Sequence, residues 1–133
     1  MSLAPSLTHT SSVRTNRSGL IALWILQFAL AGMFLLAGGS KLAGAPAMVA
    51  LFNAVGIGQW FRYVTGVIEV SSAIALFVPS VAVFGALALT VTMVGAVVTQ
   101  LFIVGGSPVM PAILLLGSAA VVWVRRHQLL AIN

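Results

Sequence analysis

The stretch that decides the fold is Val81–Val104, "VAVFGALALTVTMVGAVVTQLFIV", a run of 24 residues without a charged side chain. At a rise of about 1.5 Å per residue, an α-helix of this length is long enough to cross a hydrocarbon core of about 30 Å. The run therefore predicts a membrane-spanning helix. The rest of the chain is therefore interpreted as part of a protein that lies in a lipid bilayer.

The composition of the whole chain agrees with a membrane setting. Hydrophobic residues make up 61% of the 133 residues and charged residues only 5%, whereas about a quarter of a soluble domain is charged. Cysteine is absent from the sequence, which excludes disulfides and thiolate metal sites within the chain. Both histidines, His9 and His127, lie outside the apolar runs, so we predict no metal site and no cofactor bound by ligands of this chain alone.

Three further apolar runs flank the central one. Pro79 cannot continue a helix and marks a turn, and the "GGSP" of residues 105–108 breaks the next helix. Together with Val81–Val104, the runs predict an all-α, membrane-embedded four-helix bundle; they are Leu20–Ala37, Tyr63–Val78 and Val109–Val124.

The first two spans are joined by "GGSKLAGAPAMVALFNAVGIGQWFR", residues 38–62, whose apolar middle is too short to cross a bilayer. Trp60 and Tyr63 carry amphipathic rings that suit the headgroup level. We therefore expect a short interfacial or re-entrant segment between helices 1 and 2.

The charged residues at the ends of the spans predict the domain limits and the orientation. Residues 1–18 are expected to form a disordered cytoplasmic tail, residues 19–126 the transmembrane domain and residues 127–133 a short C-terminal tail. An even number of spans places both tails on one side. By the positive-inside rule both termini lie in the cytoplasm of a multi-pass protein of the plasma membrane, with Arg14, Arg17, Arg125 and Arg126 on that side against Lys41 and Arg62 on the other.

Small side chains recur every three or four residues along the central span. A stripe of this kind lets helix backbones approach closely in lipid, where hydrophobicity does not drive helices together. We interpret the stripe as a helix-packing seam, made of Gly85, Ala88, Thr92, Gly95 and Thr99.

Glu69 is the only acidic residue of the chain, and it lies inside the second predicted span. Arg62, Thr65, Glu69 and Ser72 are spaced by three, four and three residues and share one helix face. A carboxylate inside a membrane normally faces the protein interior and finds a partner. Lys41 is the better candidate partner, because Arg62 is two helical turns away from Glu69.

These residues predict a polar pocket near the non-cytoplasmic face. Glu69, Lys41 and Arg62 would line it, with Thr65 and Ser72 on the same helix face and Gln100 reaching it from the end of the third span. The alternative is a buried ion pair that only fixes helix register. For Gln27 we expect a hydrogen bond between helices instead of a place in the pocket.

Three segments, taken in order, resemble a known family of small membrane proteins. They are "LQFALAGMFLLAGGSKLAG" at 26–44, "WFRYVTGVIEVSSAIALFVP" at 60–79 and "MVGAVVTQLFIVGG" at 93–106. Over about Leu20–Arg126 the chain is similar to the DoxX-like family of four-helix membrane proteins. The resemblance carries the family pattern onto Lys41, Gly66 and Glu69. Gln100 stands where the family often has histidine, which puts metal or haem binding in doubt.

What the resemblance implies is an accessory or assembly component of a membrane redox or envelope-stress system, and it leaves open whether the protein is an enzyme. The alternatives are a quinone- or lipid-binding membrane enzyme that uses a Glu69/Lys41 pocket and, less favoured, a small proton-coupled transporter. The expected partners are the lipid bilayer and another membrane subunit or a second copy. The cations are scattered at the ends of the spans, which argues against nucleic acid.

Overall fold

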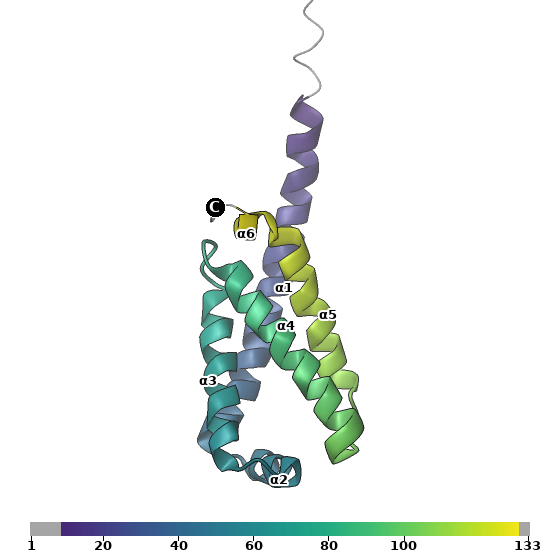
Figure 1. Cartoon of the computed structure of the whole chain (residues 1–133). Coiled ribbons are helices and arrows are strands. Elements are labelled where there is room, and N and C mark those ends of the chain that lie inside the picture. The colour runs from purple at the N-terminus through teal and green to yellow at the C-terminus, as the bar shows by residue number, and fades with distance from the viewer. Residues whose placement is uncertain (1–8, 131–133) are drawn as a thin grey trace, which may run out of the picture.

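The structure, a computed structural model, describes residues 9–130, with side chains described for residues 17–129. Within this range it is all-helical and contains no strand (Figure 1). The predicted all-α class is therefore confirmed. The elements in chain order are α1 His9–Ala43, α2 Pro46–Val55, α3 Gln59–Ala75, α4 Ala82–Thr99, the π-helical turn η2 Gln100–Val104, α5 Val109–Arg125 and α6 His127–Leu130.

Two helical stretches are long and apolar enough to cross a membrane, namely Arg17–Ala43 and Ala82–Val104. The second reproduces the run that decided the fold to within one residue. Val109–Arg125 is a shorter apolar helix. The helices are thus compatible with a membrane protein, as the composition predicted.

Local chemistry sets the helix ends near α2. Pro46 begins α2, where its missing N–H is not needed for an intrahelical bond. Gly56 ends it at φ +84°, and its N–H donates to the carbonyl of Phe52. A backbone conformation in this left-handed region is adopted most easily by glycine. The short segment expected between the first two spans is therefore a ten-residue helix.

The long helices pack in sequence order, α1 on α3, α3 on α4 and α4 on α5, and α5 returns to α1. Figure 1 shows α2 lying across one end of the molecule, where η2 also lies, and α6 at the opposite end. Toward the η2 end, α4 diverges from α3 (Figure 1). The two ends are therefore packed differently.

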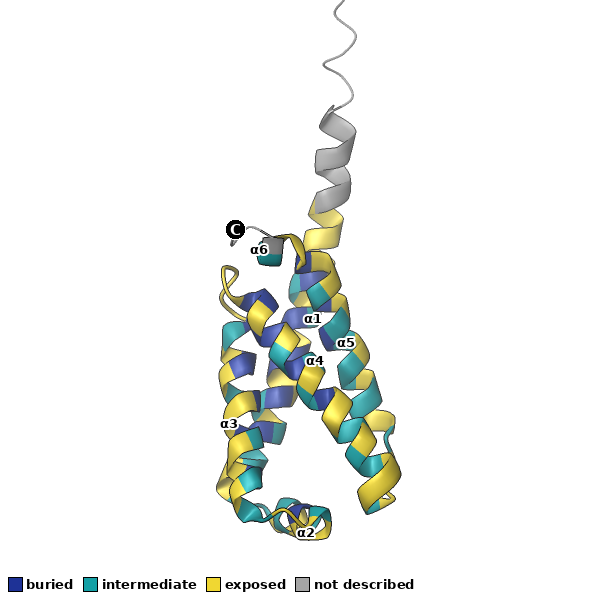
Figure 2. Cartoon of the chain, viewed as in Figure 1, coloured by how far each residue is buried: buried dark blue, intermediate teal, exposed yellow. Residues whose placement is uncertain are grey.

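The apolar core lies away from the η2 end. Its largest fully buried side chains are contributed by several helices, and η2 itself has no buried residue. Figure 2 shows this distribution along α4, whose buried positions concentrate in the half away from η2. The largest buried apolar side chains are Phe34, Leu76, Leu89, Val83 and Val121.

The predicted tails differ from the structure where the structure describes them. Residues 1–8 lie outside the described residues, but residues 9–18 are helical and extend α1 beyond the expected disordered tail. The side chain of Arg14, which was counted for orientation, also lies outside the described residues. The expected C-terminal tail contains α6, and residues 131–133 lie outside the described part.

The predicted small-residue seam is confirmed at Gly85 and wrong at Gly95. A Cβ atom on Gly85 would lie 2.7 Å from the Ser72 carbonyl oxygen and 2.9 Å from the Ala75 Cβ, so α3 and α4 meet closely there. A Cβ on Gly95 would meet nothing within 4 Å. The reason is the divergence of α4 from α3, which opens the far half of the seam to a cavity.

Candidate functional site

The divergence of the helices leaves a partly open cavity of about 520 Å³. Its walls come from α1, α2, α3, α4, η2 and α5, and most of the lining side chains are apolar. Cavities of about 300–1,000 Å³ with apolar walls and a few placed polar groups are typical of small-molecule sites. The cavity is therefore the candidate functional site.

The charged part of its wall is an ion pair between Lys41 and Glu69. The Lys41 Nζ lies 3.1 Å from Oε1 and 3.2 Å from Oε2 of Glu69. Glu69 is only 1% exposed, whereas the Lys41 side chain keeps 13% of its surface open. The predicted pairing of these two residues is confirmed. Because an ammonium carries three N–H donors, one remains for another acceptor after both carboxylate oxygens are satisfied.

Glycines bring the two helices of this ion pair together. A Cβ on Gly38 would lie 2.8 Å from a Val70 methyl and 3.0 Å from both the Glu69 Cβ and the Gly66 carbonyl oxygen. On the other helix, a Cβ on Gly66 would lie 3.1 Å from the Gly38 carbonyl oxygen. A side chain at either position would push α1 and α3 apart and separate the ion pair. The motif analysis included Gly66 but missed Gly38, although both are helical glycines close to the charged residues.

Arg62 lies beside the cavity and does not line it. Its Nη1 donates a hydrogen bond to the Lys41 carbonyl, and its Nε donates to Gln59 Oε1 at 2.7 Å. The Gln59 amide in turn donates to Asn53 Oδ1 at 2.9 Å and to the Val49 carbonyl at 3.0 Å. Arg62 therefore ties the end of α1 to α2 and α3. The structure does not bring it into the predicted pocket.

The other predicted polar residues separate into two groups. Thr65 and Gln100 line the cavity with Lys41 and Glu69. The Thr65 hydroxyl also donates to the Phe61 and Arg62 carbonyls of its own helix. Ser72 does not line the cavity, because it lies buried in the part of α3 that packs against Gly85. Four of the six predicted residues therefore share one cavity.

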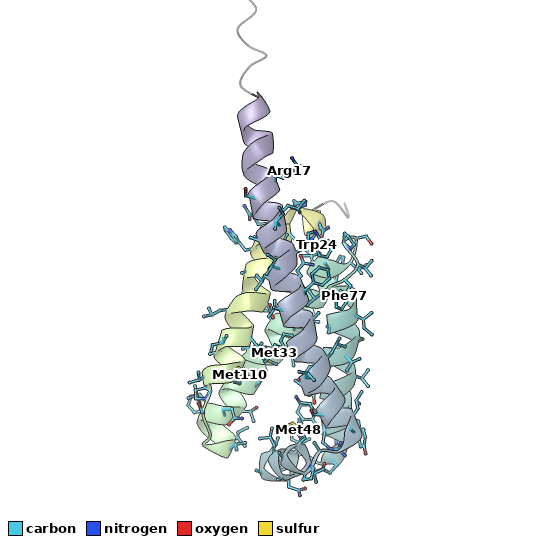
Figure 3. The ribbon with its side chains drawn as sticks, turned by 180° about the vertical axis from the view of Figure 1, so that it is seen from behind. Arg17, Trp24, Met33, Met48, Phe77 and Met110 are labelled. Atoms are coloured by element: carbon cyan, nitrogen blue, oxygen red, sulfur yellow. The ribbon has the colours of Figure 1, made fainter. Side chains whose placement is uncertain are left out.

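The apolar walls include a helix that sequence reasoning had placed at the membrane interface. Met48, Phe52 and Val55 of α2 line the cavity, opposite Met110 of α5. Figure 3 shows Met48 on α2 and Met110 on α5. The helical spacing of the α2 residues was visible in the sequence. Which part of the protein this apolar face of α2 contacts depends on the positions of α4 and α5, and the spacing alone does not predict those positions.

A second polar cluster lies at the opposite end, around Gln27. Its Nε2 donates to the Leu76 carbonyl at 2.7 Å, and its Oε1 accepts a hydrogen bond of 2.6 Å from Arg125 Nε. The expected hydrogen bond of Gln27 between helices is confirmed. The burial of Arg125 was missed, because an arginine at the end of an apolar run is normally a solvated charge that reports orientation.

Over residues 9–130, the structure is all-helical, with helices able to span a membrane and a largely apolar cavity whose wall carries the ion pair of Lys41 and Glu69. The sequence profile of the DoxX-like family matches residues 25–128. The chain therefore belongs to the DoxX-like family, and the resemblance of its three segments is confirmed. Searches of the curated proteins and of the solved structures find no match.

Proposed function

We propose that this DoxX-like protein is a multi-pass plasma-membrane protein that binds a lipid-like molecule with an apolar body and a polar head. Its cavity would take the apolar body, and the ion pair of Lys41 and Glu69 would take the head. The main observation that supports this proposal is that the ion pair forms part of the wall of an otherwise largely apolar cavity of about 520 Å³. An isoprenoid quinone is the candidate ligand.

The membrane part of the proposal treats α1, α3, α4 with η2, and α5 as a four-helix bundle with both termini in the cytoplasm. Helix α3 is the one that needs support as a span, since its 17 residues contain both Arg62 and Glu69. Both charged groups have partners inside the protein, Arg62 through Lys41 and Gln59 and Glu69 through Lys41. Partners of this kind lower the cost of charged residues in a bilayer. The partners therefore support α3 as a span.

The head-binding part follows from the hydrogen-bonding capacity of the pair. The remaining N–H of Lys41 can donate to a carbonyl or hydroxyl oxygen of a ligand. The Glu69 carboxylate can accept a hydrogen bond from a ligand hydroxyl or exchange a proton with it. A quinone offers a carbonyl and its reduced form offers a hydroxyl, so both forms suit the two groups. The redox chemistry would belong to the ligand, not to the protein side chains.

The test is to purify the protein in mild detergent and identify bound small molecules by mass spectrometry. We expect a specific quinone or lipid with the wild type, and its loss in Glu69→Gln. Gly95→Leu should also exclude it, because Gly95 lines the cavity and has free space for a side chain. Gly32→Leu is the matched control, since Gly32 is equally free of neighbours but lies outside the cavity wall.

Two outcomes would count against this function. One is a wild-type protein that is well folded and carries no specific molecule. The other is a bound molecule that Gly95→Leu and Gly32→Leu retain equally, because the ligand would then lie outside the cavity.

A second candidate is the accessory or assembly subunit of a membrane redox or envelope-stress system. It is favoured by the outward face of α1, where Gly32 and Gly39 have no neighbour within 4 Å of an added Cβ and flank the 71% exposed Leu36. Such a face allows close approach of a partner helix. Gly32→Trp should abolish co-purification of a partner subunit if this face is used. Recovery of the same partner with the variant would exclude this face.

A further inference from the structure

The end of the molecule opposite the cavity contains a buried arginine. Arg125, the last residue of α5, is only 6% exposed. Its Nε donates to Gln27 Oε1 at 2.6 Å, and its guanidinium carbon lies 5.2 Å from the centroid of the Trp24 ring. Gln27 is itself fixed to the Leu76 carbonyl just beyond α3. Residues of α1, α5 and the end of α3 therefore hold this guanidinium in place.

No acidic side chain of the protein can neutralise Arg125. Glu69 is the only Asp or Glu in the sequence, and it pairs with Lys41 at the other end of the bundle. The groups that the structure places on Arg125 are an amide and an indole, both uncharged. A buried cation is costly unless an anion accompanies it. Among the described residues, Arg125 therefore has no anionic partner.

The neighbouring residues increase the positive charge. Arg126 follows directly, with its guanidinium carbon 4.2 Å from the centroid of the Trp123 ring, and Arg17 lies on α1 about two turns before Trp24. Figure 3 shows Arg17 and Trp24 along the same end of α1. Arginine over an aromatic ring is oriented but not neutralised. An external anion would therefore be attracted to this end.

We propose that Arg125 is the centre of a binding site for the phosphate group of an anionic phospholipid headgroup. Its Nε is used by Gln27, so the pair of Nη groups remains to meet two phosphate oxygens in the forked geometry that suits arginine. Among the described residues, the hydrogen bond to Gln27 is the one that Arg125 makes through its side chain.

The surroundings favour a lipid over free phosphate. Leu20, Ile21 and Trp123 present exposed apolar surface at the same end, where acyl chains would lie beside the helices. Tryptophans also suit the level at which headgroups meet the hydrocarbon. Basic pockets between membrane helices on the cytoplasmic side are known to bind anionic headgroups. The inference rests on the membrane setting of the proposed function but not on its ligand cavity.

The experiment measures thermal unfolding of the full chain in detergent during titration with phosphatidylglycerol, phosphatidylcholine or inorganic phosphate. For the wild type we expect stabilisation by phosphatidylglycerol alone. In Arg125→Gln the phosphatidylglycerol concentration for half-maximal stabilisation should rise by about tenfold or more. Arg126→Gln is the matched control with the same change of charge, and it should change this concentration by about twofold or less.

Arg125→Lys keeps the positive charge but loses the two-pronged hydrogen-bonding geometry of the guanidinium. This variant replaces Arg125→Gln in the experiment if Arg125→Gln does not fold. We expect an intermediate loss of affinity for phosphatidylglycerol. Glu69→Gln should leave the phosphatidylglycerol effect unchanged, which separates this site from the cavity at the other end.

Several results would overturn the proposal. Equal stabilisation of the wild type by phosphatidylcholine would remove the need for an anion. Stabilisation by inorganic phosphate to the same extent would identify a site for free phosphate instead of a lipid. Wild-type affinity for phosphatidylglycerol in Arg125→Lys and Arg125→Gln, or an equal loss in Arg126→Gln, would show that Arg125 is not its centre.

Discussion

The two ends of this helical protein each hold a cation, half-buried Lys41 at one and buried Arg125 at the other, but they hold it differently. At the α2 and η2 end, Lys41 pairs with the only acid of the chain, and α4 stands apart from α3 around a cavity. At the other end, Arg125 has an amide and an indole as partners, and α3 and α4 press together at Gly85. The difference shows that helix separation, not the presence of charge, distinguishes the two ends.

The largest effect is expected from removing the lysine of the ion pair. Lys41→Met leaves the Glu69 carboxylate buried without a counter-charge, which should lower the free energy of unfolding by about 3–5 kcal/mol. The measurement is reversible unfolding of the purified protein in detergent. The double variant Lys41→Met, Glu69→Leu should recover most of the loss, because neither charge remains. A single variant as stable as the double would show that the pair does not hold this end together.

A matched pair of glycines separates the tight end from the open one. Gly85→Ala should lower the free energy of unfolding by about 1–3 kcal/mol, since the new methyl would overlap the Ser72 carbonyl and Ala75. Gly95→Ala on the same helix should raise it by up to about 1 kcal/mol, because the space is open and alanine favours helix. Equal responses of the two variants in thermal unfolding would contradict the different packing of the two ends.

The two amides provide a smaller contrast. Gln27→Leu leaves the Leu76 carbonyl and Arg125 Nε without their partner and should cost about 1–2 kcal/mol of unfolding free energy. Gln100→Leu, at the cavity wall, should change it by less than about 0.5 kcal/mol. Chemical unfolding of both variants checks this. A larger loss for Gln100→Leu would mean that the Gln100 amide, and not only the ion pair, stabilises the cavity end.

The helices themselves could be predicted from the sequence because their limits are local. Pro79 separates α3 from α4, and the glycines and Pro108 separate η2 from α5, wherever the helices pack. The uncharged run of α4 and η2 appears within one residue of its prediction. The start of α1 was placed too late, since a polar composition rich in serine and threonine favours a tail but does not prevent a helix from continuing.

The site could be predicted only in part, because a shared helix face does not tell which neighbour covers it. Arg62 and Ser72 share a face with Glu69, yet Arg62 turns to the end of α1 and Ser72 meets α4 at Gly85. Glu69 lies between them, at the height where α4 has begun to diverge. This divergence depends on contacts between segments distant in the sequence, so it cannot be predicted from the spacing of residues along α3.

The π-helical turn η2, whose first residue Gln100 lines the cavity, determines how the chain would accommodate an inserted or deleted residue there. The Gly105 N–H donates to the Gln100 carbonyl five residues earlier, so this turn holds one residue more than an α-helical turn. Deleting one residue from Gln100–Val104 would convert this wide turn into an α-helical one and leave the residues beyond it at nearly the same position around the helix axis, because the residue removed is the extra one. We therefore expect η2 to tolerate insertion or deletion of one residue while the helix Ala82–Thr99 stays unchanged.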